Sequence, residues 1–208
     1  MEDISFTTFQ NNQLQKTTAQ DLLKNKRVLI CSVVRPYQNL PYLYINQIID
    51  KMPFYQEHGI DEVYIVNSAN GLHIIALLEK NFPKIVALSD NDARLVEYLR
   101  IKMGKEHQAL DYLSKYWSYQ VLFNNGEIEQ FYEQPTEKII KNLVNSGNKL
   151  NLKTQKFFVT EGEDMAIQRP ALTDPEQLWH PDGGLVFYYN LWPNRRLEQY
   201  LLDNATQS

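Results

Sequence analysis

Short apolar runs alternate with amphipathic stretches along the first two thirds of the chain. Continuous apolar, β-branched runs bounded by polar residues are typical of strands buried on both faces of a sheet. Three such runs predict strands over Val28–Val34, Glu62–Val66 and Lys84–Leu88. A further short strand is predicted at Ile4–Phe9, within an otherwise polar segment rich in Gln, Asn and Thr.

The stretches between these strands have helical periodicity. Leu43–Glu57 carries one apolar face, and Pro53 is expected to kink or split that helix. Asn70-Gly71 marks a turn into a helix over His73–Lys80. Asn91 or Asp92 is expected to cap the next helix. The apolar faces of the first and third helices are Ile45, Ile48, Ile49 and Met52, and Leu95, Val96, Leu99 and Met103.

A β-hairpin gives the clearest local signal in the chain. Tyr119–Phe123 and Glu127–Tyr132 flank Asn125-Gly126, and Asn-Gly supplies the positive φ that a tight hairpin turn requires. A capped turn is predicted after Thr17-Thr18, and a helix is predicted from Thr136. Strand–helix alternation followed by a hairpin and a helix predicts an α/β thioredoxin-like fold, a central mixed sheet with helices on both faces.

The same pattern divides the chain into a thioredoxin-like domain over 1–145 and a C-terminal extension over 146–208. Arg195–Leu202 is predicted to be helical. Aromatic residues gather in the extension, and we expect them to pack on the domain or to form an interface with a protein partner. They are Trp179, Phe187, Tyr188, Tyr189 and Trp192.

Composition narrows the range of functions. A net charge of −4 with scattered basic residues argues against nucleic-acid binding. No apolar run approaches the roughly 18 residues that a membrane span needs, and the acidic start Met1-Glu2-Asp3 lacks a secretory pattern. We therefore expect a cytoplasmic protein, with signal-less secretion left open. One cysteine, Cys31, excludes an internal disulfide, and four scattered histidines show no metal spacing, so no metal or cofactor is predicted.

Three blocks resemble the peroxiredoxin family, in the class of the atypical enzymes and the peroxiredoxin–glutaredoxin hybrids. Thr17–Leu29 is similar to that family's Thr-Thr-x-x-Leu-Phe-Lys-Gly-Lys-Arg-Val-Val stretch, and Gly59–Tyr64 to its Gly-Val-Asp-Glu-Val. Tyr116–Gly126, continuing to Gln134-Pro135, is similar to its Ser-Trp-Arg-Tyr-Ser-Met-Leu-Val-x-Asn-Gly block. The blocks keep family order and spacing. The resemblance implies a thioredoxin-like fold and a homodimer.

The resemblance fails at the family's active site. Peroxiredoxins carry the peroxidatic cysteine in a Pro-x-x-x-Thr/Ser-x-x-Cys loop and use an arginine to assist it. Ungapped counting places Pro41 at the cysteine position, Gln38 at the threonine position and Ser118 at the arginine position. The former pocket would consist of Arg35, Tyr37, Gln38, Pro41, Tyr42 and Ser118.

Two interpretations of Cys31 lead to different functions. As a buried core residue it supports a peroxiredoxin-like pseudoenzyme that binds a small molecule or a protein partner. As an exposed thiol it would support a divergent thiol oxidoreductase. A structural subunit of an oligomer is a third possibility. The sequence leaves it open whether the chain is an enzyme.

Overall fold

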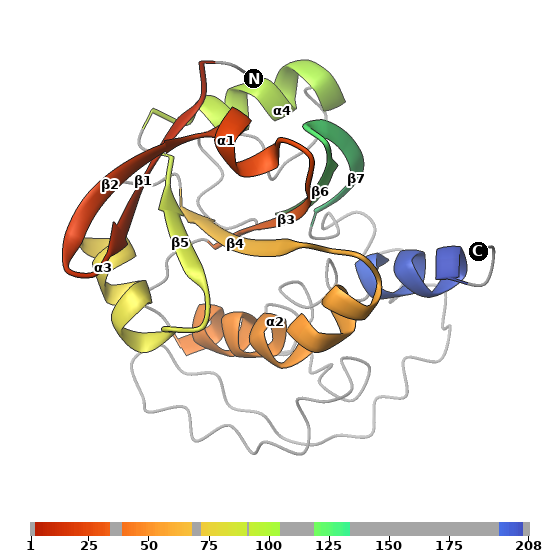
Figure 1. The fold of residues 1–208 in the computed structure, drawn as a ribbon, viewed down its shortest axis with the longest axis horizontal. Helices are drawn as coiled ribbons and strands as arrows, with labels where there is room; N and C mark the ends of the chain where they lie inside the picture. Colours follow the sequence, from red (N-terminus) through yellow and green to blue (C-terminus); the bar gives the residue numbers. More distant parts are fainter. Residues whose placement is uncertain are drawn as a thin grey trace, which may run out of the picture.

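A seven-stranded mixed sheet lies at the centre of the computed structural model, with the strand order β2-β1-β5-β4-β3-β6-β7 (Figure 1). The structure describes residues 3–33, 39–67, 72–90, 92–104, 119–133 and 196–205, without the side chains of 39–43 and 72–74. The strands are β1 Ser5–Gln10, β2 Gln13–Thr18, β3 Arg27–Ser32, β4 Glu62–Asn67, β5 Val86–Ser89, β6 Tyr119–Asn124 and β7 Glu127–Glu133. The helices are α1 Ala19–Leu23, α2 Asn39–Glu57, α3 Leu72–Asn81, α4 Arg94–Met103 and a C-terminal helix over 196–205.

Strands β3, β4 and β5 pair in parallel, and β6 joins β3 antiparallel. Alternate residues of β3 point to opposite faces of the sheet, as the pleat requires. Leu29 and Cys31 belong to the cluster under α2, α3 and helix 196–205, whereas Val28 and Ile30 belong to the cluster under α1 and α4. The predicted α/β fold, with a mixed sheet and helices on both faces, is confirmed.

The hairpin and the first helical turn were predicted correctly. Asn125 and Gly126 have φ of 50° and 85° between β6 and β7, the left-handed pair that a tight hairpin turn uses. Thr18 caps α1, because its hydroxyl accepts a hydrogen bond from the Asp21 N–H at 3.1 Å. Both features depend on local sequence, which is why the pattern alone finds them.

Two elements differ from what the sequence predicts. Strand β2 was missed, because its side chains are mostly exposed and its sequence is polar; Asn11 and Asn12, at φ of 52° and 62°, form the turn that returns it to β1. Helix α2 begins at Asn39 rather than Leu43 and continues through Pro53 without splitting, whereas the alternative of a kink at Pro53 stays a prediction. Its buried residues, such as Ile48 and Tyr55 on either side of the proline, hold both halves against one core cluster.

The C-terminal helix 196–205 matches the helix predicted near the end of the chain. Its Leu197 and Leu201 are buried in the same cluster as Ile48 of α2. Figure 1 shows this helix (blue) beside α2. The domain boundary at 145/146, the helix predicted from Thr136 and the aromatic residues of the extension lie outside the described residues. None of the helices in the described ranges combines the length and apolar character that a bilayer span requires.

Candidate functional site

The carboxyl ends of β3, β4 and β5 meet at one edge of the sheet. Because these strands are parallel, Ser32, Asn67 and Ser89 end them at the same side, and β6, antiparallel to β3, begins there at Tyr119. In open α/β sheets this edge is where ligands bind. Residues 34–38 and 111–118, which adjoin β3 and β6 along the chain, contain most of the predicted pocket.

Two described polar side chains at this edge, Ser32 and Asn67, form hydrogen bonds with backbone groups. The Tyr119 N–H donates to Ser32 Oγ at 2.7 Å, and the Asn67 amide donates to the Val33 carbonyl at 2.7 Å. Each of these side chains is buried. These hydrogen bonds therefore fix the spacing of the strand ends, and both side chains have a structural role at this edge.

Asp90, directly after β5, holds the start of α4. It is fully buried, and its two carboxylate oxygens accept hydrogen bonds from the backbone N–H groups of Arg94 at 2.8 Å and Leu95 at 3.1 Å. Ala93, at φ 51°, occupies the cap position and has no side-chain hydrogen bond. The prediction that Asn91 or Asp92 caps this helix is therefore wrong, because the left-handed turn at Ala93 brings Asp90 to the free N–H groups.

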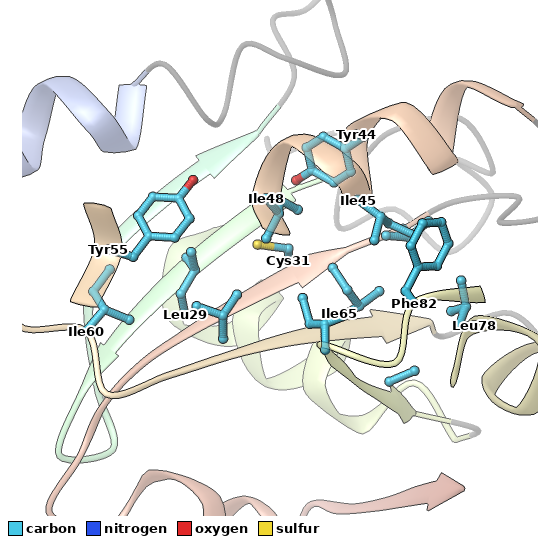
Figure 2. Close-up of a cluster of buried hydrophobic side chains, with 14 of the residues drawn as sticks. Leu29, Cys31, Tyr44, Ile45, Ile48, Tyr55, Ile60, Ile65, Leu78 and Phe82 are labelled. Atoms are coloured by element: carbon cyan, nitrogen blue, oxygen red, sulfur yellow. The ribbon is translucent and has the colours of Figure 1, made fainter. Parts of the chain in front are cut away.

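Cys31 is the penultimate residue of β3 and has no exposed surface. Burial raises the pKa of its thiol far above the usual value, and a hydrogen bond with the Tyr44 hydroxyl offsets only part of that rise. Figure 2 shows Cys31 beneath α2, among Tyr44, Ile45 and Ile48. The interpretation of Cys31 as a buried core residue is confirmed, since the side chain has no exposed surface.

Tyr44 and Gln120 extend this buried polar contact across the sheet. The Gln120 amide donates to the Tyr44 hydroxyl at 3.1 Å, and Gln120 pairs with Cys31 in the β3–β6 register. Burial raises the phenol pKa of Tyr44, so the hydroxyl stays neutral. Together the three side chains connect α2, β3 and β6 below the candidate edge. Sequence reasoning missed Tyr44 and Gln120, and the only available signal was a polar residue at a core position of a strand.

Two further tyrosine hydroxyls are buried in the described structure without a hydrogen-bond partner among the described residues. They belong to Tyr55 on α2 and Tyr119 on β6. Burial raises the pKa of both phenols. Neither group can therefore supply a phenolate near neutral pH.

The relative positions of the predicted pocket side chains lie outside the described part of the structure. Pro41 and Tyr42 fall in the first turn of α2, with their side chains outside the described set. Arg35, Tyr37, Gln38 and Ser118 lie outside the described residues altogether. The replacement of the family's cysteine, threonine and arginine therefore stays a prediction from sequence.

Within the described ranges no group of three His, Cys, Asp or Glu side chains could hold a metal ion. His58, the one histidine whose side chain is described, bonds through Nδ1 to the Phe54 carbonyl at 2.8 Å and stacks on the Phe54 ring at 4.1 Å. These contacts indicate a structural role for His58, directly after the last residue of α2.

Comparison with known proteins places these features in a family context. No family model matches the chain. Over 136 residues it is 22% identical to the hybrid peroxiredoxin hyPrx5 of Haemophilus influenzae, an alignment that covers 64% of this chain and 56% of the relative. The match thus spans little more than half the length of that relative.

Solved peroxiredoxin structures share the fold. Reduced Prx3 of Vibrio vulnificus in complex with H2O2 aligns with a TM-score of 0.52 and 15% identity, covering 65% of this chain and 85% of Prx3. AhpC of Enterococcus faecalis aligns with a TM-score of 0.50 and 14% identity, covering 70% and 89% of the two chains. At these identities the likeness establishes the fold alone. Taken with the hybrid peroxiredoxin match and the three sequence blocks, it identifies the chain as a peroxiredoxin-like protein with a thioredoxin-like fold.

Proposed function

We propose that this peroxiredoxin-like chain lacks thiol peroxidase activity and acts by binding a small molecule or a protein partner. One observation carries the proposal: the only cysteine of the 208 residues is fully buried in β3. A thiol peroxidase needs a thiolate that peroxide can reach. Cys31 offers neither, because burial raises its pKa and α2 covers it.

The decisive experiment is peroxide consumption by the purified chain in the presence of excess dithiol reductant. We expect the chain and its Cys31→Ala variant to consume peroxide at the same rate as reductant alone. Consumption that needs the chain and is lost in Cys31→Ala would overturn the proposal and support the divergent oxidoreductase. Mass spectrometry after mild peroxide treatment gives a second readout, with unmodified Cys31 as the expected result.

Binding at the carboxyl edge is the use that the retained scaffold supports best. Ser32, Asn67 and Asp90 keep the strand ends in place although the sequence predicts that the peroxidatic residues are replaced. Arg35 would supply a cation for a small anionic ligand at this edge. Calorimetric titration with small carboxylates and phosphate, on the chain and on Arg35→Ala, tests this; heat that is unchanged in Arg35→Ala would argue against it.

The homodimer and the cytoplasmic location belong to the same proposal, since both derive from the resemblance and the composition. Light scattering of the full chain measures the dimer directly. A monomer at all concentrations would remove the oligomer subunit as an alternative function.

A further inference from the structure

Helix 196–205 sits on the body of the protein through one apolar face. Leu197 and Leu201, one turn apart, are 0% and 2% exposed within the core cluster that contains Tyr55 of α2 and Leu122 of β6. Tyr200 packs against the same cluster. Apolar residues at i, i+3 and i+4 on a short helix form the pattern by which a helix binds in a groove.

The polar contacts around this face are few and lie at its border. Lys51 Nζ is 3.2 Å from Glu198 Oε2, and the two side chains are 46% and 25% exposed, so solvent weakens the attraction. The Tyr200 hydroxyl donates to Glu129 Oε1 of β7 at 2.9 Å. Glu129 also bonds to Arg27 of β3, which connects the helix to the centre of the sheet.

The core cluster under helix 196–205 contains one unfavourable feature, a buried hydroxyl. The Tyr55 hydroxyl is buried in this cluster and has no hydrogen-bond partner among the described residues. A buried hydroxyl without a partner lowers the stability of the packing that buries it.

Helix 196–205 depends on the surface that it packs against. The connection to β7 is long enough for the helix to bind that surface on its own chain or on another copy. A helix as short as the ten described residues of this one is marginal in water without tertiary contacts. About 60 residues separate β7 from the helix along the chain, and a chain of that length extends to about 200 Å at most. The same helix can therefore reach the identical surface on another copy.

We propose that the surface of α2 and β7 under helix 196–205 is a helix-binding site that also accepts this helix from a second copy of the chain. The exchanged helix makes the same contacts with Lys51, Glu129 and the Tyr55 cluster, so exchange adds no new interface and closes as a two-fold dimer. The inference goes beyond the proposed function, because it holds whether or not Cys31 reacts.

Site-directed crosslinking tests the exchange. One chain carries Lys51→Cys and a second carries Glu198→Cys; the two are mixed, incubated and treated with a short bismaleimide. Buried Cys31 does not compete for the reagent. We expect a covalent hybrid of the two chains, identified by mass spectrometry, whose yield rises with total concentration.

Three controls define the outcome. The double variant Lys51→Cys/Glu198→Cys should crosslink within one chain at low concentration, which confirms that the helix occupies this seat. Gln13→Cys on β2, at the opposite edge of the sheet from β7, should give no hybrid with Glu198→Cys. Adding Leu201→Asp to the Glu198→Cys chain should lower the hybrid yield several-fold.

Two results would overturn the proposal. One is an intrachain crosslink in the double variant together with no hybrid above the Gln13→Cys control, even at chain concentrations on the order of 1 mM, where exchange competes with a tethered helix. The other is failure of the double variant to crosslink within one chain, because the helix would then not occupy this surface in solution. Neither result bears on peroxide consumption.

Discussion

Tyr44 of α2, with its ring and hydroxyl buried, packs in one core cluster with Cys31 of β3, and so helps to cover the chain's only cysteine. The same hydroxyl accepts a hydrogen bond from Gln120 of β6. A thiol in this position packs between a helix and the sheet. Its surroundings are opposite to those of a reactive cysteine, which needs solvent access and a lowered pKa.

Cys31 should therefore resist thiol reagents in the folded protein. We expect no reaction with an aromatic disulfide reagent under native conditions and one thiol per chain in denaturant, because labelling requires unfolding of the core strand. The variant Gln13→Cys, with an added thiol on exposed β2, should label one thiol at once. Rapid labelling of Cys31 in the native protein would contradict its burial.

Tyr44 and Tyr55 offer a matched pair of hydroxyl deletions on one helix. Tyr44→Phe removes the acceptor of the Gln120 amide and should lower the free energy of unfolding by about 1–2 kcal/mol. Tyr55→Phe removes a buried hydroxyl that lacks a partner among the described residues, so stability should stay equal or rise.

Urea denaturation of both variants measures the difference. Both variants keep the aromatic ring, so a difference in stability reports on the hydroxyl groups alone. Equal destabilisation by the two substitutions would show that the Tyr44–Gln120 hydrogen bond does not stabilise the fold. We expect the free energy of unfolding to be higher for Tyr55→Phe than for Tyr44→Phe.

The sequence predicted the buried half of the fold better than its exposed parts. Continuous apolar runs predicted β3, β4 and, with a shift in its bounds, β5, because a strand covered on both faces has no polar side. Strand β2 was not predicted, since an edge strand such as Gln13–Thr18 can be polar along most of its length. Only the Asn11-Asn12 pair, which supplies two positive φ values, could have revealed that hairpin.

The candidate site was harder to predict because its buried polar contacts join distant segments. Gln120 and Tyr44 are 76 positions apart, and no local pattern connects them. The capping side chain of α4 was predicted to be Asn91 or Asp92, one or two residues after Asp90, which accepts the hydrogen bonds. The left-handed Ala93 decides which carboxylate reaches the N–H groups, and residue type does not predict a left-handed alanine.

Asp90 and Asp92 can be separated by substitution. Asp90→Ala leaves the N–H groups of Arg94 and Leu95 without their acceptor and should cost about 2 kcal/mol. Asp92→Ala alters an exposed side chain and should stay within about 0.5 kcal/mol of the parent. Urea denaturation, with hydrogen exchange of the α4 amides, checks both; the reverse order would restore Asp92 as the cap.

Glu129 gives the protein a predictable response to acid. Partial burial by itself would raise the pKa of this carboxyl, but hydrogen bonds from Arg27 and Tyr200 and the charge of Arg27 outweigh burial and lower it below its usual 4.5. A carboxyl with a lower pKa in the folded state stabilises the protein above its unfolded pKa, and that contribution disappears as pH falls through the folded value. Glu129→Gln should therefore be less stable than the parent near pH 7, and the difference should shrink below about pH 4.5.

Urea denaturation at pH 7, 5 and 3.5 measures this difference, with Glu97→Gln as the control because that carboxylate is half exposed and 3.8 Å from Arg100. Since Tyr200 donates to Glu129, the lost stability should appear first in helix 196–205, as faster hydrogen exchange of its amides in Glu129→Gln at pH 7. A constant difference between parent and Glu129→Gln across this pH range would mean that the charge of Glu129 does not hold the helix. The two-leucine contact of Leu197 and Leu201 would then be the main attachment of that helix to α2 and the sheet.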